Sequence, residues 1–250
     1  MSKAFGGLRA VDRVDFAVSA GAIAGIIGPN GAGKTTFFNV IARLYPATSG
    51  RIEFDGKDVT GLRAHDMASR GLARTFQTTA LFTDATAVES VMVGYAHRAR
   101  AGLWDALLHT RRYAREERET RDASREALDF VGLALFAERP VTGLTQEQQK
   151  RLAIALALVG RPRLLLLDEP FAGVSADQMR GLAELVEKIA RHGITVCLIE
   201  HQMQMVMGLC QRITVLNYGR KIAEGTADEI RRDPTVIEAY LGGHAQPKRA

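Results

Sequence analysis

The run G-P-N-G-A-G-K-T at residues 28–35 is the part of the sequence best suited to binding phosphate. Its glycines let the backbone curl so that consecutive N–H groups point inward at phosphate oxygens. The run follows the apolar stretch I-A-G-I-I and precedes a predicted helix, whose positive N-terminal end favours an anion. This order matches the P-loop pattern in full, so we expect Lys34 to reach the β- and γ-phosphates of a nucleotide and the Thr35 hydroxyl to bind Mg²⁺. The nucleotide-binding residues predicted in this segment are Gly28, Pro29, Asn30, Gly31, Ala32, Gly33, Lys34, Thr35 and Thr36.

Two adjacent acids follow a second apolar run, L-L-L-L-D-E-P at residues 164–170. The buried strand predicted here delivers Asp168 to the edge of a sheet, where its carboxylate can hold Mg²⁺. Glu169 lies one step further and can take a proton from an attacking water. The alternative is that these acids only cap a strand end, but two adjacent acids followed by proline are unusual by chance.

Three further residues carry weaker signals. His201 follows the predicted strand in I-T-V-C-L-I-E-H, and we favour contact with the γ-phosphate over a purely structural role. Gln77 stands in A-R-T-F-Q, where a loop glutamine by itself usually has no function. Phe5 is an N-terminal aromatic residue that either packs or stacks on adenine.

The elements needed to position these residues alternate between strand and helix. Residues 14–27 indicate two short strands around S-A-G, a helix should follow the glycine loop as far as Pro46, and D-G predicts a hairpin within 50–62. A helix after Thr145, an amphipathic helix before the second apolar strand, a further hairpin and two short closing helices complete the pattern. Such alternation predicts a doubly wound α/β core with an added lobe.

Composition is that of one folded globular unit. The 250 residues are 46% hydrophobic and 24% charged, enough for a sizeable core. Two cysteines fit a reducing compartment, and neither a signal peptide nor a membrane span is found. The net charge of +5 is compatible with an anionic ligand or membrane face and proves neither. The arginine-rich helical stretch between residues 85 and 130 is either a solvated face or a helical subdomain that meets a partner.

Together, the P-loop, R-T-F-Q, the L-x-x-x-Q segment before L-L-L-L-D-E-P, and I-E-H make the chain resemble the ATPase subunit of an ABC transporter. The resemblance covers nearly the whole chain. F-G-G-L-R-A-V, G-L-A-R-T-F-Q-T-T-A-L-F and the tail I-A-E-G-T-A-D-E-I-R-R-D-P-T-V-I-E-A-Y-L-G are similar in particular to the branched-chain amino acid (and related amide) importer ATPases of bacteria.

The resemblance implies an α/β P-loop NTPase fold with a RecA-like parallel-sheet core, an antiparallel β-subdomain and an inserted helical subdomain. Residues 1–250 would form one ABC ATPase domain, with the helical subdomain at about 85–160 and a C-terminal helical tail at about 225–250. Gln77 would bind nucleotide and Mg²⁺ and link the site to the helical lobe and the membrane subunits.

The same resemblance implies a function and an assembly. The chain would hydrolyse ATP with Mg²⁺ to drive uptake of branched-chain amino acids or related amides. Its partners would be the permease membrane subunits, a second ABC ATPase subunit (identical or different) and, indirectly, a periplasmic or extracellular solute-binding protein. It would lie in the cytoplasm on the inner face of the bacterial membrane. The alternative is a weakly hydrolysing regulatory subunit paired with an active ABC ATPase. Action on nucleic acid lacks support, because such ATPases usually carry paired domains in one chain.

Three departures from the family pattern matter. The signature L-S-G-G-Q, expected to act on nucleotide bound by the other subunit, is here Leu144, Thr145, Gln146, Glu147 and Gln148. Ser175 replaces the usual Asp or Asn, and only four residues precede Phe5 where the family has a further strand, so that edge of the antiparallel sheet is not predicted.

Glu147 is the departure with an energetic consequence. Thr145 and Gln148 form a capping-box pattern, and an acid in the first turn favours a helix by about 0.3–1 kcal/mol. Facing a γ-phosphate about 5 Å away, however, each like-charge pair costs roughly 3 kcal/mol at an effective dielectric constant near 20. We therefore expect a sound helix start and a poor signature, unless the Glu147 side chain swings into solvent.

Overall fold

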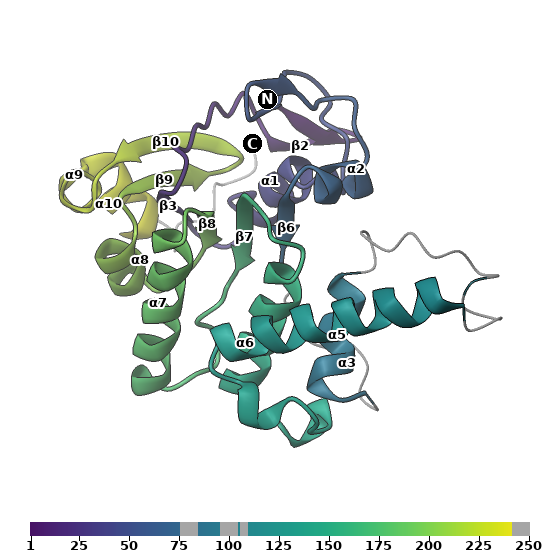
Figure 1. The fold of residues 1–250 in the computed structure, drawn as a ribbon. Coiled ribbons are helices and arrows are strands. Elements are labelled where there is room, and N and C mark those ends of the chain that lie inside the picture. The colour runs from purple at the N-terminus through teal and green to yellow at the C-terminus, as the bar shows by residue number, and fades with distance from the viewer. Residues whose placement is uncertain (76–84, 96–104, 106–109, 242–250) are drawn as a thin grey trace.

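A six-stranded sheet forms the centre of the molecule (Figure 1). The structure is a computed structural model that describes residues 1–75, 85–95, 105 and 110–241. Within the sheet the strand order is β10-β9-β3-β8-β7-β6, and all neighbours are parallel except the β9–β10 hairpin. The strands are β3 (Ile23–Ile27), β6 (Leu72–Arg74), β7 (Leu164–Asp168), β8 (Thr195–Ile199), β9 (Arg212–Asn217) and β10 (Arg220–Gly225).

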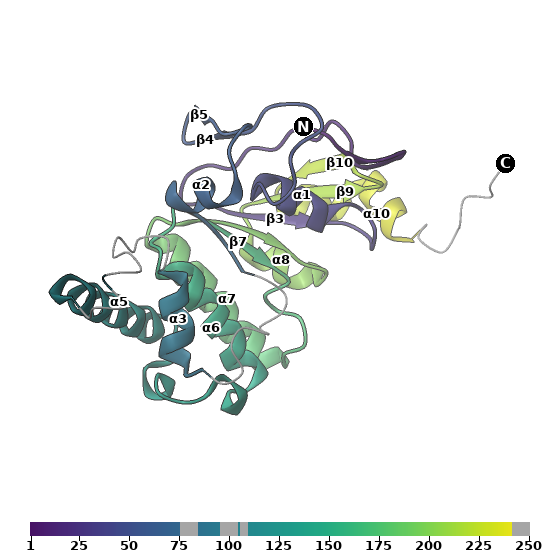
Figure 2. The same cartoon turned by 90° about the vertical axis from the view of Figure 1, so that its right-hand side faces the viewer.

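Helices cover both faces of this sheet, as Figure 2 shows. Alternate residues of one strand point to opposite faces, so Leu164 and Leu166 pack with Phe37 and Phe38 of α1 (Lys34–Ile41), while the other leucines of β7 pack with α7 (Ala176–Arg191). The short helix α2 (Ala64–Ser69) lies on the α1 side, and α8 (Met203–Leu209) lies on the α7 side. Because β3, β7 and β8 are buried throughout, they read as continuous apolar runs in the sequence.

A group of helices packs together beside the sheet. It contains α3 (Ala87–Gly94), α5 (Arg111–Phe130), α6 (Gln146–Leu158) and the short 3₁₀ turns η2 (Ala134–Phe136) and η3 (Val141–Gly143). The fully buried side chains of α5 all lie in its C-terminal half, and its N-terminal half extends away from the body (Figure 1). In the part of the chain that the structure describes, no helix is both long enough and apolar enough to span a membrane.

The antiparallel part consists of two ribbons. β1 (Lys3–Phe5) pairs with β2 (Leu8–Val11), and β4 (Glu53–Phe54) pairs with β5 (Lys57–Asp58). The second ribbon confirms the predicted hairpin, because Asp55 and Gly56 both have positive φ, as a two-residue turn of type I′ requires.

Two sequence-based boundaries were wrong. Residues 14–18 are not a strand: Val14 is buried as their alternation suggests, but no neighbouring strand in the described residues pairs with them. Burial sets the side-chain pattern, whereas a strand also needs a hydrogen-bonded neighbour. α1 ends at Ile41 rather than near Pro46, and Arg43 just beyond it adopts a left-handed conformation that a helix cannot continue through.

The chain continues after β10 into α9 (Ala227–Arg232) and α10 (Pro234–Leu241), which confirms the two short helices predicted there. Thr226 caps α9 through a capping box with Glu229. α10 contacts both α9 and β10, and burial against the body raises the pKa of Tyr240 to about 12, with its hydroxyl against the Gly28 backbone.

Candidate nucleotide site

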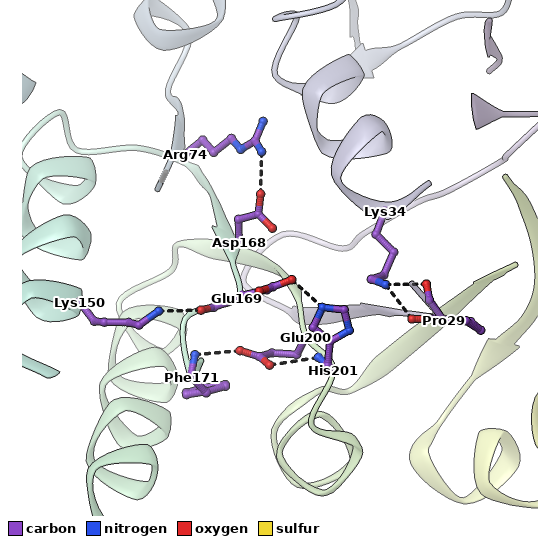
Figure 3. A network of polar contacts seen from close by, with 10 residues as sticks. Pro29, Lys34, Arg74, Lys150, Asp168, Glu169, Phe171, Glu200 and His201 are labelled. Atoms are coloured by element: carbon purple, nitrogen blue, oxygen red, sulfur yellow. Dashed lines mark hydrogen bonds and ion pairs between the residues drawn. The ribbon is translucent and has the colours of Figure 1, made fainter. Parts of the chain in front are cut away.

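Four neighbouring parallel strands end at one edge of the sheet, and each leads into a candidate residue. β3 runs into Gly28, β8 into the segment before His201, β7 ends at Asp168 and β6 ends at Arg74. In parallel sheets the crevice beyond the carboxyl ends of the strands is the usual place for a ligand. The fold thus gathers motifs that are far apart in the sequence (Figure 3).

The glycine loop has the backbone that its sequence predicts. Gly28, Gly31 and Gly33 have φ values of 151°, 77° and 96°, a region that residues with a side chain rarely adopt. A side chain at Gly33 would also place its Cβ 2.2 Å from the Ala10 carbonyl oxygen. α1 begins directly after Gly33 with no side-chain cap and no acid in its first turn. Its first N–H groups are therefore well placed to donate hydrogen bonds to an anionic ligand.

Lys34 is buried at the start of α1. Its Nζ donates to the carbonyl oxygens of Gly28 (2.7 Å) and Pro29 (3.0 Å), so the ammonium lies along the loop (Figure 3). Burial lowers the pKa of Lys34, while the nearby carboxylates of Glu169 and Asp168 oppose that fall. The result is a partly desolvated cation close to two acids.

Asp168 is held by a residue that the sequence analysis did not single out. Its side chain is only 2% exposed, and its Oδ2 lies 2.7 Å from Nη2 of Arg74, itself 7% exposed. The other oxygen, Oδ1, is buried and has no hydrogen-bond partner among the described residues. Arg74 stands in the quoted A-R-T-F-Q segment, but nothing local in that segment indicates a partner near residue 168.

Glu169 has an unusual backbone and a short contact to the predicted histidine. Its φ is 51°, a costly conformation for a non-glycine residue and one found often at functional sites. Its Oε1 lies 2.6 Å from Nε2 of His201, and its carbonyl oxygen accepts a hydrogen bond of 2.9 Å from Lys150 Nζ on α6. The structure thus brings together Glu169 and His201, which were predicted separately.

Glu200 is a second residue that the sequence analysis passed over. Its buried carboxylate accepts hydrogen bonds from the backbone N–H groups of Phe171 (2.8 Å) and His201 (3.1 Å). Burial raises the pKa of Glu200 despite these donors. The sequence feature that could have pointed to Glu200 is its position in I-E-H, between an apolar strand and His201. Glu200 fixes the segment after Glu169 against the segment that carries His201 (Figure 3).

The signature segment lies at the start of α6. Thr145 is the N-cap: its hydroxyl accepts from the Gln148 N–H (3.3 Å), and Gln148 Oε1 accepts from the Thr145 N–H (3.0 Å), which confirms the capping box. The Glu147 carboxylate does not swing into solvent but forms an ion pair with Arg151 one turn later, with only 15% of the Glu147 side chain exposed. Arg151 also donates to the Val131 carbonyl oxygen (2.9 Å).

Two further signature residues have contacts within this chain. Leu144 is buried, and the Gln146 side chain lies against Gly173, where an added Cβ would come within 2.2 Å of its Nε2. Ser175 caps α7 through a capping box with Gln178. Serine therefore serves as a helix cap at the position where the family usually has Asp or Asn.

Phe5, Gln77 and Thr35 stay predictions, as do the roles of the other site residues. Phe5 lies at the end of β1 and packs edge-to-face on Tyr45, with ring centroids 5.4 Å apart, and Lys3 Nζ lies 4.8 Å from the Phe5 centroid. Gln77 lies outside the described residues. Thr35 is exposed on the first turn of α1, directly after Lys34.

A cation at this site would need ligand oxygens as well as protein oxygens. No cluster of three or more His, Cys, Asp or Glu side chains able to hold a metal occurs in the described part of the chain. The orphaned Asp168 Oδ1 next to the phosphate loop nevertheless fits Mg²⁺, which is usually held by one or two carboxylates together with substrate phosphates.

The fold and this site define a P-loop nucleotide hydrolase, and comparison with known proteins identifies which kind. The ABC transporter family matches residues 11–172. The chain belongs to the ABC transporter family and is one of its ATP-hydrolysing cassettes. A second family, described as branched-chain amino acid ATP-binding cassette transporter, matches residues 220–246.

Individual relatives agree along almost the full chain. BraF of Pseudomonas aeruginosa, a high-affinity branched-chain amino acid transport ATP-binding protein, is 42% identical over 95% of this chain and 94% of that protein. LivG of Escherichia coli, described in the same terms, is 40% identical over the same shares. A nucleotide-free ATP-binding cassette from an ABC transporter superposes with a TM-score of 0.85 at 31% identity, over 96% of this chain and 95% of that one. These likenesses confirm the predicted fold class.

Proposed function

We propose that this chain binds ATP with Mg²⁺ and hydrolyses it to drive import of branched-chain amino acids or related amides. Support for the solute class comes from the names of its relatives and from the matching C-terminal family, at residues 220–246. The comparisons give no support to the alternative of a weakly hydrolysing regulatory subunit.

Each predicted residue has a role in this proposal. The loop N–H groups and Lys34 hold the phosphates, and the adenine would stack on Phe5. Thr35, Asp168 and Gln77 would hold Mg²⁺, which when bound offsets the charge of the β- and γ-phosphates. Glu169 accepts the proton of the attacking water, and His201 contacts the γ-phosphate and orients Glu169.

The observation that carries this proposal is the contact between His201 Nε2 and Glu169 Oε1 at 2.6 Å, at the strand edge where the phosphate loop also lies. A general base oriented by a second polar group is the usual arrangement for activating water. The half-exposed position of His201 leaves the pair accessible from the crevice.

The site would be completed by a second subunit. In this assembly the segment Leu144–Gln148 of one ATPase subunit faces the nucleotide bound by the other, and the pair is either identical or mixed. The ATPase pair would dock on permease membrane subunits at the cytoplasmic face of the bacterial membrane, with an external solute-binding protein acting indirectly. We propose no nucleic acid partner.

The test is Glu169→Gln in the purified protein. This variant should keep ATP binding, lose roughly 10²–10⁴-fold in turnover, and accumulate an ATP-bound dimer that is visible by size exclusion. Lys34→Ala should instead lose detectable ATP binding by calorimetry. Glu187→Gln, the same change on the exposed face of α7, is the matched control. Full turnover by Glu169→Gln would assign the base to another residue.

A further inference from the structure

Arg74 is the only cation that forms an ion pair with Asp168 in the described residues, and several contacts hold its side chain in place. Both side chains are almost completely buried, and Nη2 lies 2.7 Å from Oδ2. A second nitrogen of the same guanidinium, Nη1, donates to Oδ1 of Asn39 on α1, and the group lies 5.9 Å from the Phe38 ring centroid. Arg74 therefore connects the helix of the phosphate loop to the predicted metal ligand.

The ion pair uses the two carboxylate oxygens of Asp168 differently. Oδ2 accepts from Arg74, whereas Oδ1 is buried with no hydrogen-bond partner in the described part of the chain. The main-chain N–H of Asp168 is close to the Thr75 hydroxyl (3.4 Å), so the residue next to Arg74 also fixes this strand end. Asp168 is thus oriented, and its carboxylate is already paired with a guanidinium before any cation arrives.

The charges around Asp168 determine what a cation would experience there. Arg74 and Lys34 are positive, whereas Glu169 and Asp168 itself are negative. The formal charges of these four side chains therefore cancel. A divalent cation at Oδ1 would be attracted by the Asp168 carboxylate, which is already paired, and repelled by the buried guanidinium of Arg74. Phosphate oxygens would add the missing negative charge.

We propose that Arg74 is a positioning residue that keeps the Asp168 site weak for free divalent cations, so that Mg²⁺ binds there only together with nucleotide phosphates. The inference rests on the proposed function, because it concerns the same metal. It assigns Arg74 two tasks: it presents Oδ1 of Asp168 to the metal and offsets the carboxylate charge until ATP is bound. Sites with one carboxylate and substrate phosphates are the usual form of Mg²⁺ binding.

The experiment measures Mn²⁺ binding to the full chain by electron paramagnetic resonance, without nucleotide and then with ADP. Wild type should bind Mn²⁺ weakly alone and much more tightly with ADP. Arg74→Gln removes the positive charge and should bind Mn²⁺ without nucleotide at least about tenfold more tightly than wild type. Arg115→Gln, which breaks an exposed ion pair with Glu119, is the matched control and should behave like wild type.

Arg74→Lys separates charge from geometry and is the second variant should Arg74→Gln unfold. It keeps the buried charge but loses the planar fork that reaches both Asp168 and Asn39. Its Mn²⁺ affinity without nucleotide should stay within about threefold of wild type. A folded Arg74→Gln that binds Mn²⁺ no better than wild type, or a tenfold gain in Arg74→Lys, would overturn the inference. Failure of wild type to bind Mn²⁺ even with ADP would instead count against the proposed function.

Discussion

At the scale of single residues, the geometry of the proposed catalytic pair depends on the buried carboxylate of Glu200. Glu200 ties the N–H groups of Phe171 and His201 together beneath the Glu169–His201 pair. A buried acceptor that serves two donors is costly to remove, because both donors would then be left without partners. The position of His201 relative to Glu169 therefore depends on Glu200.

The raised pKa of Glu200 predicts a pH dependence of stability. Since burial raises the pKa in the folded state above its ordinary value, the folded protein holds this proton more tightly than the unfolded chain. The penalty for the charged form is absent below the unfolded pKa and grows as the pH rises through the folded pKa. Wild type should therefore lose stability relative to Glu200→Gln, which does not titrate, as the pH rises from below the ordinary glutamate pKa through the raised folded pKa.

Thermal unfolding of both proteins across this range checks the sign. The melting temperature of wild type minus that of Glu200→Gln should fall with increasing pH, whereas the difference for Glu187→Gln at an exposed position should follow no such trend. A gap between wild type and Glu200→Gln that widens in favour of wild type at high pH would show that the backbone donors outweigh burial.

Site residues that belong to a short motif could be predicted from the sequence, whereas those whose position depends on distant partners could not. The positive φ angles of the loop glycines follow from the glycine spacing, and Asp168 and Glu169 follow from the apolar run before them. By contrast, Arg74 meets a partner 94 positions away, and Glu200 meets one 29 positions away. No pattern along the chain encodes such a pairing, since it depends on which strands become neighbours.

At the scale of elements, the first turn of α6 changes how its acid acts. Repulsion between Glu147 and a γ-phosphate was expected, but the carboxylate is paired with Arg151 on the next turn. The acid precedes the base by four residues, which is the favourable order on a helix. Because the pair is largely shielded from water, its attraction is screened less than that of an exposed pair. In the proposed assembly, Arg151 would therefore offset a charge that otherwise repels the nucleotide of the other subunit.

This pairing predicts an interaction between two substitutions. Arg151→Gln should lower ATP-driven association and ATPase rate by on the order of tenfold, because it leaves the Glu147 charge uncompensated. Glu147→Gly alone should change these rates little, and the double variant should recover most of the loss. The measurement is the ATPase rate as a function of protein concentration for the four proteins, with and without the natural partner subunit.

Two outcomes would contradict this reading of α6. If Glu147→Gly alone raises the rate of the isolated protein strongly, Arg151 does not offset the carboxylate, and pairing with a glycine-bearing partner subunit becomes the better explanation. If Arg151→Gln is equally inactive in the Glu147→Gly background, Arg151 acts through its hydrogen bond to the Val131 carbonyl instead. Arg151→Lys, which keeps the charge, serves as the control for that bond.

The helices and strands were largely predictable where burial patterns and local turn or cap sequences determine them. The D-G hairpin, the buried strands β7 and β8 and the caps at Thr145 and Ser175 follow from local chemistry. Residues 14–18 have the alternation of a strand but no ladder, because pairing depends on a neighbour that the local pattern does not specify.

At the scale of the whole molecule, the polar helix α5 is the part most clearly separated from the sheet. Its N-terminal half carries ion pairs such as Arg115–Glu119 (2.8 Å) and buries little (Figure 1). This opposite-charge pattern favours a solvated surface over direct insertion into lipid. Attachment to a membrane would then come from the permease rather than from this helix.

Fractionation of cells tests how the protein is attached. A chaotrope wash should release the protein from membranes if, as proposed, contacts with the permease hold it there. In cells that lack the permease it should appear in the soluble fraction. Retention on membranes without the permease would favour direct lipid binding, and α5 charge-reversal variants would then show whether its arginines are responsible.

The order of strands in the sheet also governs when during synthesis the nucleotide site can form. β3, which leads into the phosphate loop, ends at Ile27, yet its two neighbours are β8 and β9, which end much later in the chain, at Ile199 and Asn217. A ribosome-bound chain that stops short of these strands leaves β3 without either neighbour, and the loop without its support. Prematurely terminated chains would therefore carry an intact phosphate-binding sequence but no folded site, so ATP would distinguish finished subunits from unfinished ones.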